Sequence, residues 1–248
     1  MLILYFSATG NTRFVAEVFG RDMGAKCLSI EDEVDFAALI KSNEIVAFCF
    51  PIYGSRPPRN MREFVQSHGA YLAGKKVVIL ATQMMFSGDG ARSLADSLPA
   101  SVNVIYSQHF NMPNNICNTP MLRHASRRKI DRCKRKAEAK IVRICGDIRQ
   151  GVVKKRGFSG FARMMGNMQG KTWLKMEGKA RGAVKIHSDC AACGLCVEIC
   201  PVGNLEMQGG GVGQLGDCVT CYRCVNKCPR RAITVLFHRV PRWQYKGL

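Results

Sequence analysis

Eight cysteines in the last quarter of the chain form two copies of one pattern, C-x2-C-x2-C-x3-C-P. The first copy runs from Cys190 to Pro201, and the second runs from Cys218 to Pro229. Three thiolates with two-residue gaps can surround one face of an iron–sulfur cube, and the proline turns the chain away after the fourth. Zinc usually takes paired C-x2-C elements, and a disulfide scaffold needs an exported chain, so both alternatives fit poorly. The pattern therefore predicts two [4Fe–4S] clusters.

The fourth cysteine of each copy lies too far round to complete its own cube, so it is expected to ligate the other cluster. Such crossed ligation would tie the two copies into one small domain that depends on its clusters. The rule assigns Cys190, Cys193, Cys196 and Cys228 to cluster I, and Cys218, Cys221, Cys224 and Cys200 to cluster II.

The two runs together resemble a bacterial two-cluster ferredoxin, which implies a small α+β domain over residues 183–248. The sequences after each proline also match, as two halves of an internal repeat. The halves differ inside their triplets, where Tyr222 and Arg223 stand in place of Gly194 and Leu195. We therefore expect inequivalent clusters, and we hypothesise that the Arg223 cation raises the reduction potential of cluster II.

The first 118 residues alternate short apolar runs with segments of helical periodicity. Strands are expected at residues 2–6, 27–30, 45–50, 77–81 and 102–106, and helices after residue 12 and at 35–41, 61–66 and 91–98. Continuous apolar strands separated by helices favour a parallel sheet that is covered on both faces. Ligands of such sheets bind at the carboxyl ends of the strands, where the strand order switches.

Three loops that follow strands of this sheet have unusual compositions, and all would lie at that edge. Residues 7–12 offer hydroxyls and backbone N–H groups at a helix N-terminus, which stabilise a phosphate without a basic residue. Residues 51–55 place an aromatic ring beside a glycine, and residues 82–89 contain a second aromatic ring and another glycine. A phosphate cradle with two ring-flanking loops suits flavin mononucleotide (FMN).

The run Ser7-x-Thr9-Gly10-Asn11-Thr12 resembles the phosphate loop of flavodoxins, and the whole chain resembles the flavodoxin/ferredoxin fusion proteins of anaerobes. This resemblance implies an α/β fold: a doubly wound, five-stranded parallel flavodoxin-like sheet of order 2-1-3-4-5, within residues 1–150. Many flavodoxins stack a tryptophan on the flavin from the second loop, where this chain has Tyr53. The implied FMN contacts are Ser7, Thr9, Gly10, Asn11 and Thr12 to the phosphate, then Pro51, Ile52, Tyr53 and Gly54, and then Thr82, Gln83, Phe86, Gly88 and Asp89.

The net charge of +19 is concentrated in residues 119–182, which carry 19 Lys and Arg against 4 Asp and Glu. Apolar periodicity predicts a long basic helix from Arg123 to Arg149 that closes the sheet, followed by a basic amphipathic linker over residues 151–182. The cations could form a solvated helix face, or bind the acidic docking face of a redox partner, an anionic membrane surface or nucleic acid. No base-reading fold is evident, and of the functional alternatives we favour a redox partner.

Together these features predict an electron-transfer protein that passes low-potential electrons between external redox partners, two [4Fe–4S] clusters and FMN. One alternative is a ferredoxin-dependent flavin reductase, which needs a positioned proton donor; none is identifiable, and Gln83, Asp89 and His109 are the candidates for a place near the flavin. Another is a redox sensor. Gly211–Gly216 matches G-x-G-x-x-G, but it lies between the cysteine runs, where no dinucleotide-binding strand–turn–helix unit can form. Scattered free cysteines and the lack of a recognisable export signal or membrane span favour the cytoplasm.

Overall fold

The computed structural model describes residues 1–122 and 124–248. Its largest element is a sheet in which all strands are parallel, with the order β2-β1-β3-β4-β5-β6. The doubly wound flavodoxin-like fold and the order 2-1-3-4-5 are thereby confirmed. The strands are β1 (Leu2–Tyr5), β2 (Lys26–Ser29), β3 (Ile45–Pro51), β4 (Lys76–Gln83), β5 (Asn103–Asn111) and β6 (Lys154–Lys155).

The predicted count of five strands was wrong, because the chain returns to the sheet edge to add β6. Lys154 and Lys155 pair with Tyr106 and Ser107 of β5. Gly151, with a φ of 72°, begins this return just after the preceding helix. A strand of two lysines shows no alternation and has low β propensity, so the sequence contains no signal for it.

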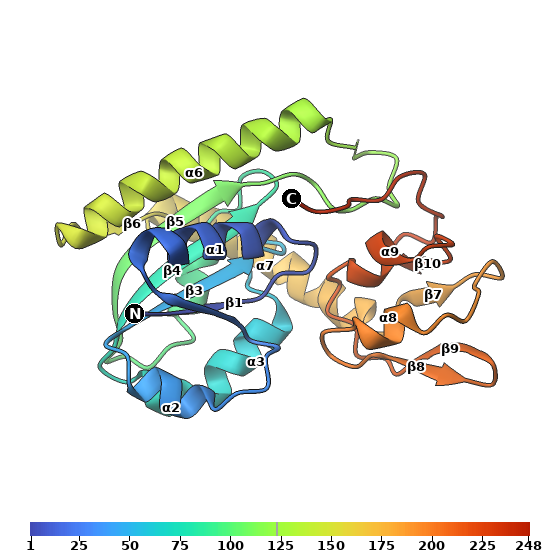
Figure 1. Cartoon of the computed structure of the whole chain (residues 1–248), viewed down its shortest axis with the longest axis horizontal. Helices are drawn as coiled ribbons and strands as arrows, with labels where there is room; N and C mark the ends of the chain where they lie inside the picture. The colour runs from blue at the N-terminus through green and yellow to red at the C-terminus, as the bar shows by residue number, and fades with distance from the viewer. Residues whose placement is uncertain (123) are drawn as a thin grey trace.

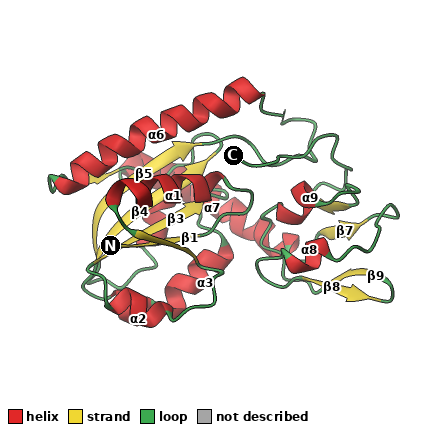
Figure 2. Cartoon of the chain, in the orientation of Figure 1, coloured by secondary structure: helices red, strands yellow, loops and turns green. Residues whose placement is uncertain are grey.

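Helices cover both faces of the sheet (Figures 1 and 2). One face packs against α1 (Asn11–Met23) and α6 (Arg127–Arg149), which contribute Val15, Phe19 and Ile141 to a buried apolar cluster. The other face packs against four shorter helices. These are α2 (Phe36–Lys41), α3 (Arg59–Ser67), α4 (Gly69–Leu72) and α5 (Gly90–Ala95). Coverage on both sides explains why β1, β3 and residues 77–81 of β4 are apolar.

Two long helices occupy the basic middle segment. The predicted start of α6 at Arg123 lies outside the described residues, and the helix as described begins at Arg127. The segment predicted as a linker contains one 21-residue helix, α7 (Gly160–Ala180), which leads from the sheet to the C-terminal part (Figure 1). Among the described helices, none is long and apolar enough to cross a membrane.

The C-terminal part contains two small antiparallel sheets and two short helices. Strand β7 (Val184–Ile186) pairs with β10 (Ile233–Val235), and β8 (Leu205–Gln208) pairs with β9 (Gly211–Gln214). The helices α8 (Leu195–Glu198) and α9 (Arg223–Lys227) occupy corresponding places in the two cysteine runs. The G-x-G-x-x-G match begins in the β8–β9 hairpin and therefore lacks the strand–turn–helix context of a dinucleotide site.

Candidate functional site

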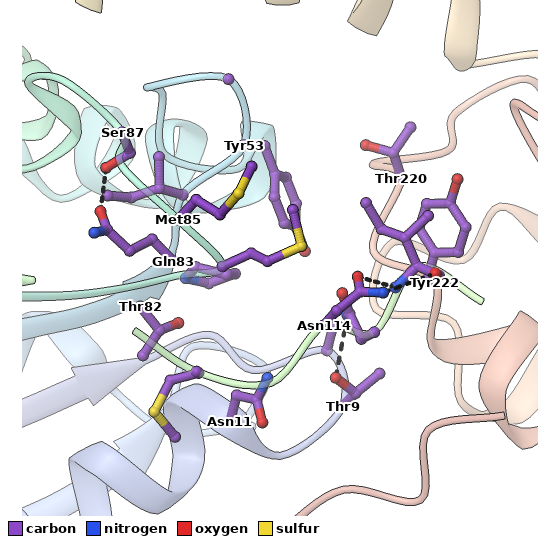
Figure 3. A pocket seen from close by; sticks show the side chains of 18 of the residues that line it. Thr9, Asn11, Tyr53, Thr82, Gln83, Met85, Ser87, Asn114, Thr220 and Tyr222 are labelled. Atoms are coloured by element: carbon purple, nitrogen blue, oxygen red, sulfur yellow. Dashed lines mark hydrogen bonds between the residues drawn. The ribbon is translucent and has the colours of Figure 1, made fainter. Parts of the chain in front are cut away.

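The loops after β1, β3 and β4 meet in one cavity of about 350 Å³, at the carboxyl edge of the sheet (Figure 3). We call it the flavin cavity after the cofactor expected from the sequence, and its volume is usual for a cofactor site. In the described part of the chain, none of its lining residues is Asp, Glu, His, Lys or Arg. Eleven of the fourteen residues predicted to contact FMN line it: Ser7, Thr9, Asn11, Thr12, Pro51, Ile52, Tyr53, Gly54, Thr82, Gln83 and Phe86.

The first loop lines this cavity and ends at the N-terminus of α1. Gly10 caps α1 with a φ of 100° and has no side chain to occupy the cap, so the first turn of α1 keeps N–H groups without intrahelical acceptors. Ser7 Oγ accepts the Gly10 N–H at 3.2 Å, and Thr12 Oγ1 lies 2.7 Å from Thr82 Oγ1. This donor set fits a phosphate group.

Other parts of the chain hold the shape of the first loop. Asn11 donates to the Pro113 carbonyl at 2.8 Å and accepts from the Tyr245 hydroxyl at 2.6 Å. Thr9 Oγ1 accepts from the Asn115 amide at 3.1 Å. We infer that these two side chains fix the loop while backbone groups remain for the ligand.

Gly10, Gly88 and Asp89 do not line the cavity. Gly88 has a φ of 40°, and a Cβ there would lie 2.7 Å from the Gly166 nitrogen of α7. The fully buried Asp89 carboxylate pairs with Arg92 and faces Gly166. These two residues of the third loop therefore pack against α7 and do not line the flavin cavity.

Helix α7 forms a wall of the cavity that the sequence did not reveal. Gln169, Trp173 and Met176 line it. The Trp173 ring lies 5.8 Å from the Tyr53 ring, centroid to centroid, and Trp173 packs directly on Gly54. The second loop has Tyr53 and no tryptophan, and a distant helix supplies a tryptophan beside it. Only the isolated tryptophan in a glycine- and methionine-rich segment hinted at it.

The C-terminal part closes another side of the same cavity. Thr220 and Tyr222, which flank Cys221, line it together with Leu236 and Phe237 (Figure 3). Burial raises the pKa of the Tyr53 hydroxyl well above its usual value, and the neighbouring Cys221 raises it further. The flavin cavity therefore adjoins the second cysteine run.

All thirteen cysteines are free thiols, and the eight in the two runs form two groups. Cys200, Cys218, Cys221 and Cys224 line one small cavity together with apolar residues that include Val184 and Leu205. In the other group, burial raises the pKa of Cys196, with smaller contributions from Cys190 and Cys228. Cys193 is exposed. Cys200, Cys218, Cys221 and Cys224, expected as one ligand set, thus line one cavity, and the crossed assignment of ligands stays a prediction.

The buried thiols suit a polynuclear metal cluster. Burial raises the pKa of Cys218 to about 11 and that of Cys221 to about 12, so iron would have to displace these protons on binding. Backbone N–H groups already point at the sulfurs in both copies, at 3.2 to 3.4 Å. The pairs are Ala192 to Cys190, Thr220 to Cys218, Asn204 to Cys200 and Ala232 to Cys228. No three His, Cys, Asp or Glu side chains among the described residues converge on a single-ion site.

Arg223 joins the second cysteine run to the phosphate loop. Its guanidinium donates to the carbonyls of Ser7 at 2.9 Å and Ala8 at 3.1 Å. It also forms two hydrogen bonds of 2.6 Å with the Glu31 carboxylate. The Arg223 side chain is 16% exposed and the Glu31 side chain 25%, so this is a partly buried contact between the two parts of the chain.

Comparisons with known proteins give matches to both parts. Residues 2–141 match a family model described as a flavodoxin domain, and residues 183–206 match one described as a 4Fe-4S binding domain. The second cysteine run lies beyond the latter match. No curated protein matches the chain significantly.

Similar solved structures include three bacterial proteins. The two-electron reduced flavodoxin of Megasphaera elsdenii is 22% identical over 57% of this chain and 99% of its own, with a TM-score of 0.39. The flavodoxin of Streptococcus pneumonia TIGR4 is 19% identical over 57% and 97%, with a TM-score of 0.34. A flavoprotein in complex with FMN from Lactobacillus acidophilus NCFM is 14% identical over 44% and 91%, with a TM-score of 0.37.

Proposed function

The chain belongs to the flavodoxin family, and from that premise we propose that it is an electron carrier with two kinds of redox centre. It would pass single low-potential electrons between external partner proteins, two [4Fe–4S] clusters and FMN. When bound, each cluster exchanges one electron and the flavin exchanges one or two. The flavodoxin and 4Fe-4S domains by themselves indicate a redox role.

One observation supports the proposal most strongly: a single cavity is lined by the flavin loops and by the residues on either side of Cys221. A cluster held by Cys200, Cys218, Cys221 and Cys224 would adjoin the flavin, while Cys193 of the other set is exposed. We therefore propose that partners exchange electrons at cluster I, and that cluster II is the centre next to FMN.

The residues of the cavity favour a carrier over a reductase. Asp89 and His109, which the sequence offered as candidate proton donors, do not line the cavity, although Gln83 does. The lining residues that titrate are Tyr53 and Tyr222, and burial raises the pKa of both hydroxyls. Neither hydroxyl suits proton transfer near neutral pH, because an efficient donor has a pKa close to the working pH.

The three-part organisation stays part of the proposal: an FMN-binding domain over residues 1–150, a connecting segment over 151–182 and a two-cluster domain over 183–248. Helix α7 lies within the connecting segment and contacts the flavin loops. We propose that it fixes the distance between the two domains. A cytoplasmic location and an acidic redox partner belong to the same proposal.

Anaerobic reconstitution with iron, sulfide and FMN, followed by stepwise dithionite titration, tests this function. We expect about eight irons and about four electrons per chain, with one electron entering each cluster and two entering the flavin. Absorbance follows the flavin and EPR follows the clusters. Uptake of about two electrons without flavin bands would contradict FMN binding, and about four irons would contradict the second cluster.

A further inference from the structure

A second, larger cavity of about 690 Å³ lies between α6 and the carboxyl half of β5, and its walls are strongly basic. Arg156, from the loop after β6, contributes from a separate segment. In the described part of the chain, no Asp or Glu lines this α6 groove. The cations that α6 contributes are Arg128, Lys129, Arg132, Lys136, Lys140 and Arg143.

Helix α6 keeps its acidic side chains away from the groove. Asp131 lies 3.6 Å from Arg127, and Asp147 accepts from Tyr106 at 2.6 Å and from Lys154 at 2.8 Å. Along the groove, positions 128, 132, 136 and 140 place like charges at successive i,i+4 steps, each of which destabilises a helix by about 0.2–0.5 kcal/mol. A solvated helix face would gain by interspersing acids here, so the arrangement indicates an external anionic ligand.

The groove also adjoins the flavin cavity. Asn111 lines the groove and accepts a hydrogen bond of 2.7 Å from Gln83, which lines the flavin cavity. Lys140 donates to the His109 carbonyl at 2.9 Å. Burial, Arg156 and Lys140 together lower the pKa of His109 to about 4, in keeping with a positive potential in the groove. A molecule bound in the groove would sit beside the flavin loops.

We propose that the α6 groove docks a carboxylate-rich surface of a redox partner protein. The inference rests on the proposed electron-carrier function and names the docking site of its partner. From Arg128 to Arg143 the groove cations extend over about 22 Å of helix, which exceeds a single phosphate. Complementary charge at such a site accelerates encounter and fixes orientation, as a transient electron-transfer complex requires.

Other polyanions fit the groove less well. The aromatic rings in its described lining, Phe110 and His109, are 1% and 4% exposed, and Lys140 lies over Phe110, so the groove offers no stacking platform for nucleotide bases. The exposed large apolar residue of α6 is Val142, which does not line the groove, so the described groove has no side chain suited to insert into a membrane. Carboxylates need neither feature.

The test compares two charge-matched variants of the reconstituted protein. Arg132→Gln/Arg143→Gln removes two exposed arginines that line the groove, and Arg127→Gln/Arg135→Gln removes two exposed arginines of α6 outside it. A fluorescent oligoglutamate peptide is the probe, measured by anisotropy over a range of salt. We expect the groove variant to bind at least about tenfold more weakly than the control variant, and binding to weaken with salt.

Three results would overturn the docking proposal. They are no peptide binding, equal weakening in both variants, and tighter groove-dependent binding of a single-stranded oligonucleotide or of anionic phospholipid vesicles. Dithionite titration of both variants tests the carrier function separately from the docking proposal. Neither variant replaces a residue of the flavin cavity or a cluster ligand, so both should take up electrons normally. Normal electron uptake without peptide binding would reject only the docking proposal. Failed electron uptake in the unaltered protein would reject the proposed electron-carrier function.

Discussion

The first cysteine run and the second differ in their surroundings, although each residue of one has its counterpart 28 positions along in the other, as Cys218 follows Cys190. Their backbones agree closely. Left-handed φ angles recur in matched pairs: 49° and 53° at Ala192 and Thr220, 75° and 63° at Gly194 and Tyr222, and 60° and 55° at Gly203 and Arg231. Non-glycine residues adopt this conformation only where the local structure requires it.

The side chains between the ligands make the difference. Cys193 is exposed, whereas its counterpart Cys221 is 6% exposed and packs, with Val219, in the apolar cluster beneath the parallel sheet. Leu195 has an apolar side chain, whereas its counterpart Arg223 donates hydrogen bonds to the carbonyls of the phosphate loop. The comparison teaches that a duplicated motif can preserve ligand geometry while the residues between the ligands decide which cluster site adjoins the flavin.

The largest expected effect comes from removing one ligand in each run. Cys193→Ser and Cys221→Ser should each lose about half of the bound iron, because each removes a ligand from one cluster. Only Cys221→Ser should also weaken FMN binding, by about tenfold or more, since Cys221 lies between two residues of the flavin cavity. Iron analysis and flavin fluorescence measure both effects. Equal loss of FMN in the two variants would remove the distinction between the runs.

Arg223→Leu tests the contact that only the second run makes. The change leaves the Glu31 carboxylate and two loop carbonyls without their donor. We expect it to lower the free energy of unfolding by about 3 kcal/mol. The midpoint of urea unfolding, followed by flavin fluorescence, measures it. Arg13→Leu is the control, because Arg13 pairs with Glu17 at the surface, where such pairs contribute about 0.5 kcal/mol. Similar shifts in both variants would mean that the Arg223 contact adds no special stability.

The same residue also tests the hypothesis that its charge sets the potential of cluster II. Glu31 binds Arg223 through two hydrogen bonds, so the pair has little net charge and its two members act in opposite directions. Arg223→Leu should lower the reduction potential of the adjoining cluster, and Glu31→Leu should raise it. EPR-monitored redox titration distinguishes the two signs. Shifts in the same direction would show that altered packing, and not charge, is responsible.

Asn226→Ala has an intermediate expected effect. The fully buried Asn226 amide donates to the Asn115 carbonyl at 2.8 Å, and its oxygen accepts the Tyr245 N–H at 2.7 Å. Its loss should cost about 2 kcal/mol, because buried backbone groups lose their partners. The counterpart in the first run, Glu198, is exposed, so Glu198→Ala should stay within about 0.5 kcal/mol of the unaltered protein. Urea unfolding compares the two, and equal costs would contradict the asymmetry.

The sequence predicted features with a regular spacing and missed those that depend on packing of distant segments. The meeting of three loops followed from apolar runs and from the shared edge of parallel strands, whereas the strand order followed from the resemblance to flavodoxins. The buried residues of helix α7 include the small Ala162, Gly166 and Gly170, so its contact face gives only a weak helical period of large apolar residues, to which Trp173 contributes. The partners of Arg223 could not be predicted, because nothing local relates it to Ser7 or Glu31.

The smallest expected effect concerns the residue that precedes each run. Asp217 contacts Arg59 at 2.9 Å and Arg181 at 2.5 Å, which joins the second run to α3 and to the end of α7. Its side chain is 35% exposed, so solvent screens the pairs, and Asp217→Asn should cost about 0.5 kcal/mol at low salt. Its counterpart Asp189 is exposed and forms no ion pair in the described part of the chain, so Asp189→Asn should cost nothing measurable. The difference should vanish at high salt, because ions screen exposed charges. A loss of stability in Asp217→Asn that persists in high salt would mean that the contact acts through local hydrogen bonding. The second run would then be joined to α3 by hydrogen bonds more than by attraction between charges.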